Sequence, residues 1–296
     1  MMLALMLLIL PVMAQDEVVT IYDLPYFDNA HELQTLDIFL PEDAGDSTYP
    51  VLFLVHGGGF IIGDKSEVHP AAMRYAEQGY AVITPNYRLA PDVHFPDAHS
   101  DVFCAMAWTL AHAEDYNLDL SRIVLMGESA GANIVAYLAT VDDATDFTRD
   151  CEFDYPENPD YDAAITFYLP VDLLSCECQF ARSMASQYLN VNITNWNDAD
   201  VIADFVEDSV LSWLDSDDPP FYMIHGENDF VVPLSESEFF VDAYQSAGGY
   251  TELVVIEGAN HGFLTSGIES TYLAQSYELI DEWLNTLFTG DDIDDR

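Results

Sequence analysis

Basic residues are almost missing from this 296-residue chain. Seven lysines and arginines, of which Lys65 is the only lysine, face 53 aspartates and glutamates, giving a formal net charge of −46. Nucleic acids and anionic membrane surfaces bind clustered basic side chains, so neither is an expected partner. Like charges repel one another and destabilise the compact state, and concentrated salt screens that repulsion. Two interpretations follow: an ordinary acidic soluble protein, or a protein adapted to high salt.

Long apolar runs are also missing beyond the first residues. Residues 1–14 are apolar and end in Val12-Met13-Ala14, but they are too short to span a bilayer comfortably. Small residues at this point are typical of a signal-peptidase site. We therefore expect a signal peptide over residues 1–14 and a secreted or periplasmic protein with no stable membrane insertion after cleavage. The segment lacks the usual lysine or arginine, which leaves a short membrane anchor or a misassigned start as alternatives.

Cysteine is scarce, with four residues in the chain. In an exported protein, Cys151 can pair with Cys176 or Cys178, since these residues share one region of the sequence. Cys104 lies in an apolar helical pattern and is expected to be a small core residue. The Cys176-Glu177-Cys178 spacing has no histidine nearby, so we expect no metal site there.

Short apolar runs alternate with longer stretches of helical periodicity. Runs such as Val51–Val55 are apolar on both faces, as strands between two helical layers are. The alternation predicts an α/β fold, with a mostly parallel sheet and helices on both faces, over residues 15–290. Residues 16–48 are expected to add antiparallel edge strands, 173–220 a small lid, and 291–296 an acidic tail. The other expected strands are Leu33–Leu40, Ala81–Thr84, Ile123–Met126, Ala163–Leu169, Phe221–His225 and Glu252–Ile256, and the expected helices are His69–Gln78, Ala98–Ala113, Ala130–Ala139, Ser235–Ser246 and Ile268–Phe288.

Gly127-Glu128-Ser129-Ala130-Gly131 matches the G-x-S-x-G pattern of a serine nucleophile. It lies directly between an expected strand and an expected helix. A nucleophile on such a tight turn needs glycines on both sides, because a Cβ there would clash. The helix N-terminus behind it favours developing negative charge. The pattern alone would also fit an ordinary tight turn, but its position makes Ser129 the candidate nucleophile.

Three consecutive glycines follow the strand Val51–Val55, in His56-Gly57-Gly58-Gly59-Phe60. Backbone N–H groups without side chains beside them can point at an oxyanion. Together with the N–H of Ala130 they supply the donors that acyl transfer requires. The alternative is a flexible glycine turn, which the position at a strand end makes less favourable.

Asp229 and His261 are the candidate partners of Ser129. Asp229 follows the late strand Phe221–His225, and His261 follows the last strand, where the imidazole-orienting acid and the base are expected. The chain order serine, aspartate, histidine is that of α/β-hydrolases and of neither protease class. Glu227 is the rival acid, although its side chain should point away across the turn. His225 is expected to pack at the strand end.

Further motifs resemble a known family. His56-Gly57-Gly58-Gly59, with Tyr87-Arg88-Leu89-Ala90-Pro91 and Phe95-Pro96-Asp97-Ala98, resembles the hormone-sensitive-lipase-like family of α/β-hydrolase esterases, from about residue 33 to residue 288. The resemblance implies an α/β-hydrolase fold and hydrolysis of carboxylic esters without a metal or organic cofactor. It also implies the oxyanion-hole donors, which are Gly58, Gly59 and Ala130.

Two features depart from that family. Glu128 stands before the nucleophile where the family has aspartate, as in carboxylesterases. The segment His225-Gly226-x-x-Asp229-x-Val231-Val232-Pro233 is more similar to bacterial acetyl and feruloyl esterases and to arylformamidases. These departures bear on the substrate rather than on the fold.

Arg88 belongs to one of the family-like motifs but is a scarce cation in an acidic chain. We expect it to form a structural ion pair rather than to bind substrate. Asp97 and Asp101 are accordingly expected to start a helix or to pair with a cation.

The expected reaction is hydrolysis of a small-molecule ester with a short to medium acyl chain, through an acyl-enzyme on Ser129. The expected lid contains many acids, which suits a soluble substrate better than a lipid droplet. Arylformamidase or amidase activity, and action on acetylated sugars or feruloyl esters, are the alternatives. A non-catalytic receptor is a remote one, because such proteins usually lose a triad member and all three are present here.

Overall fold

The computed structural model describes residues 18–42, 47–157, 159–171, 179–191, 209–265 and 271–289. The expected signal peptide, Cys176, Cys178 and the expected acidic tail lie outside these ranges. Of the helices within them, none is long and apolar enough to cross a bilayer.

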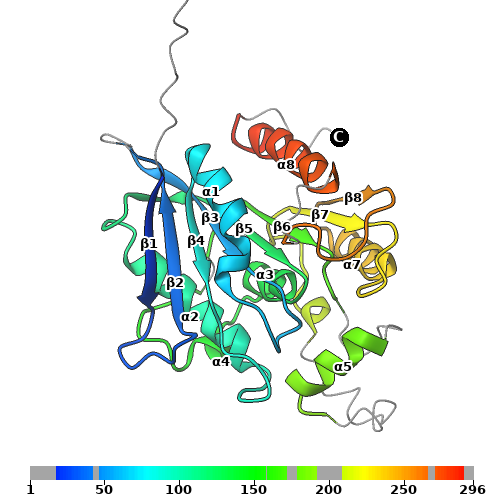
Figure 1. The fold of residues 1–296 in the computed structure, drawn as a ribbon, viewed down its shortest axis with the longest axis horizontal. Helices are drawn as coiled ribbons and strands as arrows, with labels where there is room; N and C mark the ends of the chain where they lie inside the picture. Colours follow the sequence, from blue (N-terminus) through cyan, green and yellow to red (C-terminus); the bar gives the residue numbers. More distant parts are fainter. Residues whose placement is uncertain are drawn as a thin grey trace, which may run out of the picture.

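The described residues form one eight-stranded sheet in the order β1-β2-β4-β3-β5-β6-β7-β8 (Figure 1). β1 pairs antiparallel with β2 and β2 with β4, whereas the other neighbours are parallel. The expected mostly parallel sheet with an antiparallel edge is therefore confirmed. The strands are β1 Val19–Pro25, β2 Thr35–Leu40, β3 Tyr49–Val55, β4 Ala81–Pro85, β5 Leu118–Glu128, β6 Ala163–Phe167, β7 Phe221–Gly226 and β8 Thr251–Ile256.

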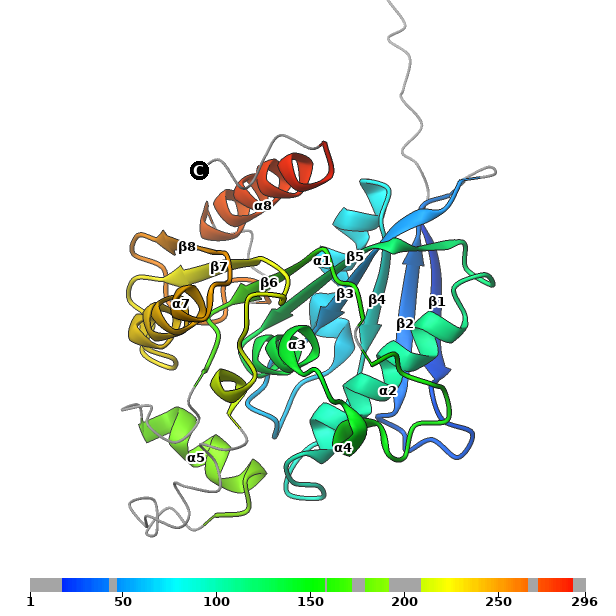
Figure 2. The ribbon, with the colours of Figure 1, turned by 180° about the vertical axis from the view of Figure 1, so that it is seen from behind.

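Helices cover both faces of the sheet (Figures 1 and 2). α1 and α8 pack on one face, around a core that contains Tyr75 and Trp283. α2, α3 and α7 pack on the other face, around a core that contains Phe103 and Phe240. The helices are α1 His69–Glu77, α2 Asp97–Ala111, α3 Ala130–Thr140, α4 Thr145–Thr148, α5 Gln179–Tyr188, α7 Leu234–Ala247 and α8 Thr271–Thr289, with 3-10 turns η1 Lys65–Val68 and η3 Val210–Ser212.

The register of the parallel strands brings the candidate motifs to one edge. Val55 at the end of β3 lies opposite Gly127 of β5, and Glu128 lies opposite Phe167 at the end of β6. Gly226 ends β7 opposite Ile256, the last residue of β8. Because parallel strands end at a common edge, the loops that follow them can form a single site.

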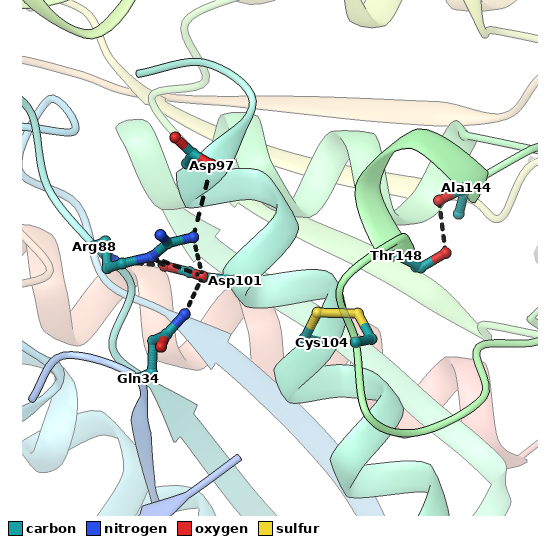
Figure 3. The surroundings of a disulfide bond; sticks show 8 residues. Gln34, Arg88, Asp97, Asp101, Cys104, Ala144 and Thr148 are labelled. Atoms are coloured by element: carbon teal, nitrogen blue, oxygen red, sulfur yellow. Dashed lines mark hydrogen bonds and ion pairs between the residues drawn. A yellow bond between two sulfur atoms is a disulfide. The ribbon is translucent and has the colours of Figure 1, made fainter. Parts of the chain in front are cut away.

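The disulfide differs from the sequence expectation. Cys104 on α2 is buried, as expected, but it is bonded to Cys151, with their Cα atoms 5.0 Å apart (Figure 3). The expected pairing of Cys151 with Cys176 or Cys178 is therefore wrong. The cause is tertiary packing: α4 lies against α2, where the rings of Phe103 and Phe147 stack 4.9 Å apart, and this brings the chain after α4 beside Cys104.

Arg88 forms the structural ion pair that was expected. Its guanidinium donates to both carboxylate oxygens of Asp101 at 2.8–3.1 Å, and it lies 3.7 Å from Asp97, the first residue of α2 (Figure 3). The side chain of Asp101 is 1% exposed and also accepts a hydrogen bond from Gln34, which precedes β2. This cluster joins the antiparallel edge of the sheet to α2.

Candidate active site

Ser129 lies on the turn between β5 and α3. Its backbone has φ 50° and ψ −119°, a conformation that L-residues rarely adopt and that lifts the side chain out of the sheet edge. The turn tolerates no side chain at Gly131, because a Cβ there would lie 2.3 Å from the carbonyl oxygen of Val55. The backbone N–H of Ser129 donates to the carbonyl of Phe167 at 2.9 Å and fixes the turn to the end of β6. The strand–turn–helix context predicted for the nucleophile is present.

The structure brings Ser129, His261 and Asp229 together. Nδ1 of His261 lies 2.7 Å from Oδ2 of Asp229, and Nε2 lies 3.0 Å from Oγ of Ser129. A carboxylate only accepts, so Nδ1 carries the proton that it donates to Asp229, and Nε2 is free to accept from the serine hydroxyl. This is the arrangement in which an imidazole can take the proton of a nucleophile.

Asp229 is held as a carboxylate in a buried position. Its side chain is fully buried, and Oδ1 accepts two backbone N–H groups, from Val231 and Val232, each at 2.8 Å. Burial alone would raise the pKa of this carboxyl, but hydrogen bonds from His225 and His261 outweigh it and lower the pKa below its usual range. Asp229 therefore remains negative at any pH near neutrality.

The two neighbouring candidates have other partners. Glu227 turns away from the triad and accepts a hydrogen bond from the backbone N–H of Gly258 at 2.9 Å. His225 is fully buried at the end of β7, with Nδ1 2.7 Å from the hydroxyl of Ser237 and Nε2 2.9 Å from the carbonyl of Val232. The expectations that Glu227 points away and that His225 packs at the strand end are confirmed.

The glycine loop after β3 lies beside Ser129. Gly58 has φ 117°, and a Cβ at this position would lie 1.9 Å from the carbonyl oxygen of Ile62, so only glycine fits. Gly58, Gly59 and Ala130 all line the cavity in front of the serine. Within the described part of the chain, their N–H groups donate to no other protein atom. These three donors are available to a negative oxygen.

His56 organises this loop through its ring. Its Nδ1 donates to the carbonyl of Gly57 at 2.7 Å, and its ring stacks on Tyr87 with centroids 4.4 Å apart. The hydroxyl of Tyr87 donates to the carbonyls of His56 and Gly57 at 3.0 and 3.2 Å. Burial lowers the pKa of His56 to about 4, so the ring is neutral and acts as a scaffold rather than as a base.

A cavity of about 240 Å³ opens in front of Ser129. Its walls are mainly apolar, and its polar lining residues include Ser129, His261 and Glu128. No group of three or more His, Cys, Asp or Glu side chains suited to a metal ion occurs among the residues described. The apolar walls come from three loops and α5: Phe60, Tyr168, Pro170, Met184, Ala185, Val231 and Val232.

Comparison with known proteins identifies the family. Residues 36–244 match the family model described as BD-FAE. The chain belongs to the BD-FAE family. Esterase LipQ of Mycobacterium tuberculosis is 30% identical over 270 residues, which are 90% of this chain and 62% of LipQ. The chain thus spans about three fifths of the length of that relative.

Two solved structures show the same fold as this BD-FAE protein. Esterase B from Lactobacillus rhamnosis superposes with a TM-score of 0.77 at 20% identity, covering 94% of this chain and 88% of the other. A propionate-bound esterase, Est2 of Thermogutta terrifontis, has a TM-score of 0.70 at 25% identity, covering 94% and 96%. The expected α/β-hydrolase fold and the resemblance to hormone-sensitive-lipase-like esterases are confirmed.

The α5 helix was not among the expected helices, although it lies within 173–220, the expected lid. Met184 packs against Gly59, and Tyr188 at the end of α5 is anchored on the core. Nε2 of His99 donates to the amide oxygen of Asn133 at 3.0 Å, so Nδ1 accepts from the Tyr188 hydroxyl at 2.7 Å. Phe60 stacks on the Tyr188 ring with centroids 4.2 Å apart. Burial lowers the pKa of His99 to about 3, so this anchor is uncharged.

A second buried carboxylate lies next to Ser129, and its role was also missed. Glu128 is 3% exposed and accepts hydrogen bonds from the hydroxyls of Tyr168 and Thr265 and from the N–H of Gly57. Tyr168 directly follows β6, at the edge where the other site residues lie. This position in the sequence could have identified Tyr168 as a site residue. Nothing in the local sequence indicates the part played by Met184.

Proposed function

We propose that this protein is a serine esterase that cleaves small-molecule carboxylic esters of short to medium acyl chains through an acyl-enzyme intermediate. One observation carries the proposal: His261 is hydrogen-bonded to both Ser129 and Asp229 beside a cavity lined by Gly58, Gly59 and Ala130. Among the described residues, the N–H groups of these three donate to no protein atom. Three side chains and an oxyanion site in this arrangement suit acyl transfer, and the catalytic roles below are part of the proposal.

In the acylation step, the hydroxyl of Ser129 attacks the ester carbonyl while Nε2 of His261 takes its proton. The buried carboxylate of Asp229 holds the ring in the correct tautomer and stabilises the imidazolium. The N–H groups of Gly58, Gly59 and Ala130 stabilise the oxyanion, and losing one such donor costs about 3–4 kcal/mol of transition-state stabilisation. His261 then returns the proton to the leaving alcohol, and water repeats the cycle to release the acid.

The shape of the cavity supports a short or medium acyl chain. Its volume of about 240 Å³ is small and its walls are mostly apolar, which suits an acyl group of a few carbons. The Thermogutta terrifontis relative was solved with propionate bound, a three-carbon acid. A short acyl group on a soluble alcohol is therefore the proposed substrate class.

A fluorophosphonate probe combined with an ester panel tests this proposal. We expect the probe to inactivate the protein and to modify Ser129 alone, as mapped by peptide mass spectrometry. We expect p-nitrophenyl acetate and butyrate to be hydrolysed faster than the dodecanoate and faster than N-formylkynurenine. Failure to hydrolyse any ester, with Ser129 unlabelled, would refute the proposal.

Met184 offers a test of how α5 shapes the substrate range. We propose that the segment 173–220, to which α5 belongs, forms a lid. In Met184→Ala, the space freed beside Gly59 should accept longer chains, raising kcat/KM for the hexanoate ester about 4-fold for each added methylene that becomes buried. The acetate ester should change less than about 2-fold, since it does not reach that wall. Exposed Ser183 on the same helix is the control, and Ser183→Ala should keep the wild-type profile.

The excess of acidic residues supports a protein adapted to salt. Lys65, Arg74, Arg88, Arg122 and Arg149 each already pair with an aspartate, so they leave most of the negative charge unbalanced. Raising KCl from 0.1 to 2 M should raise Tm by about 5 °C or more, because the screening length falls from about 10 Å to below about 3 Å. Choline chloride at equal concentration should raise Tm by a similar amount if screening is the cause. An unchanged Tm would contradict the idea.

Export is proposed on separate grounds. The Cys104–Cys151 disulfide is of a kind that persists in oxidising compartments, in agreement with a cleaved signal at residues 1–14. Sequencing the N-terminus of the protein recovered from the periplasm or medium should begin near Gln15. Recovery of the uncleaved chain from the cytoplasm alone would contradict it.

A further inference from the structure

Glu128 is a buried acid that the proposed reaction leaves without a role. Its carboxylate lies in the wall of the catalytic cavity, one residue before the nucleophile. In the described part of the chain, no lysine or arginine forms an ion pair with it. A buried acid is costly unless it is well hydrogen-bonded, so its retention in the wall of the site calls for a physical explanation.

The contacts of Glu128 join three other segments of the site to the nucleophile turn. Oε1 accepts from the N–H of Gly57 in the glycine loop at 3.3 Å. Oε2 accepts from the hydroxyl of Tyr168 at the end of β6 and from the hydroxyl of Thr265, four residues after His261, at 3.2 Å. One carboxylate thus ties the oxyanion loop and the histidine loop to the turn that carries the nucleophile.

Tyr168 connects this carboxylate to the catalytic base. Its ring is fully buried and lies against the imidazole of His261, with ring centroids 4.3 Å apart. Its hydroxyl donates to Glu128 and accepts from the backbone N–H of Leu264 at 3.4 Å. Asp229 holds His261 through Nδ1, whereas Tyr168 packs against the imidazole ring.

We propose that Glu128 is a positioning residue: its carboxylate holds Tyr168 against the imidazole of His261 and places a second negative charge near the imidazolium formed in each transition state. The inference rests on the proposed esterase reaction, in which His261 gains and loses a proton twice. Opposite charge stabilises the imidazolium but not the neutral ring of the resting enzyme, so the effect falls on kcat and leaves KM unchanged.

The titratable surroundings of Glu128 bear on its charge. Three tyrosines lie near Glu128: Tyr168 after β6, Tyr87 after β4 and Tyr277 on α8. Burial is the main cause that raises the pKa of each, so these hydroxyls stay neutral. His261 is the only group among its main electrostatic partners that carries positive charge when protonated. Burial raises the pKa of Glu128 above its usual value, although the hydrogen bonds it accepts oppose the rise. Ionised Glu128 is therefore lost progressively as the pH falls.

Glu128→Gln tests the proposal, because it removes the charge and keeps the size of the side chain. With p-nitrophenyl butyrate, kcat should fall about 10- to 30-fold with KM within about 2-fold, as expected for one charge several ångströms away at an effective dielectric constant of about 20. In the plot of kcat/KM against pH, the fall on the acid side (the acid limb) should move about one unit to lower pH, since the imidazolium has lost a stabilising charge. The difference in kcat between the wild type and Glu128→Gln should become smaller at acid pH, where the wild-type carboxyl is also neutral.

Three further variants separate charge from structure. Glu128→Asp keeps the charge, so its acid limb should stay near the wild-type position. Tyr168→Phe cuts the contact between the carboxylate and the ring, so kcat should fall several-fold with KM unchanged. Glu227→Gln is the matched control: it removes an exposed carboxylate two residues from Asp229 and should change neither kcat nor the limb. Rates are normalised to Ser129 titrated with the fluorophosphonate.

The outcomes are distinguishable. Glu128→Gln with wild-type kcat and an unmoved limb overturns the inference, and so does an aspartate variant as slow and as shifted as the glutamine variant. If Glu128→Gln does not fold, unchanged kcat in Tyr168→Phe overturns the positioning role. Wild-type protein that hydrolyses no ester refutes the proposed function instead.

Discussion

Replacing Ser129 by alanine should lower kcat/KM for p-nitrophenyl butyrate at least about 1,000-fold, because the change removes the hydroxyl that is hydrogen-bonded to Nε2 of His261. The φ of 50° at this position is adopted with serine in place, and Cβ is common to both residues, so the turn should survive the change. Hydrolysis of the ester is measured from the release of p-nitrophenol. Folding is checked by circular dichroism and Tm.

A serine on the strand before the nucleophile turn serves as the control. Ser121 lies on β5, is exposed and bonded to Asp119, and is not among the residues that line the cavity. Ser121→Ala should keep the wild-type rate and react with the fluorophosphonate, whereas Ser129→Ala should not react. A Ser129→Ala enzyme with more than about a hundredth of the wild-type rate would contradict the assignment of the nucleophile.

The second large effect is expected at Asp229. Asp229→Asn should lower kcat about 1,000- to 10,000-fold, since an amide can donate to Nδ1 of His261 and thereby favours the tautomer with a proton on Nε2. With a proton already on Nε2, this nitrogen cannot accept the proton of Ser129. Steady-state rates with p-nitrophenyl butyrate across pH 5–9 measure the effect.

The same substitution has a consequence for stability. The lowered pKa of Asp229 means that its ionised form stabilises the folded state at pH values above the ordinary range of an aspartate, and that this contribution is lost as the pH falls through the lower folded pKa. Glu227→Gln is again the control and should leave rate and stability unchanged. If Glu227→Gln lost activity and Asp229→Asn did not, the acid would have been misassigned.

Much of the site could be predicted from sequence because its geometry depends on local rules. The nucleophile turn requires glycines where backbone atoms approach closely, and Gly131 meets Val55 in just this way. The oxyanion loop requires a residue without a side chain at Gly58 for a similar reason. Asp229 and His261 could be placed because parallel strands end at one edge, so position after a strand implies proximity.

The parts that could not be predicted depend on packing between distant segments. The partner of Cys151 follows from how α4 docks on α2, and residues in the same region of sequence were a misleading guide. Met184 lines the cavity from α5, a helix that Tyr188 anchors on His99. Glu128 looked like a variant of a family motif, and its significance lies in Tyr168 and Thr265, which are 40 and 137 positions away in the chain.

The uncharged anchor between His99 and Tyr188 affects how solution measurements are understood. With a pKa of about 3 for the imidazole and a raised pKa for the phenol, neither partner changes protonation between about pH 4 and 10. The wall of the cavity that α5 provides is thus insensitive to acidity over the range in which an esterase is assayed. A change of the rate with pH in this range therefore does not arise from protonation of the anchor that holds α5.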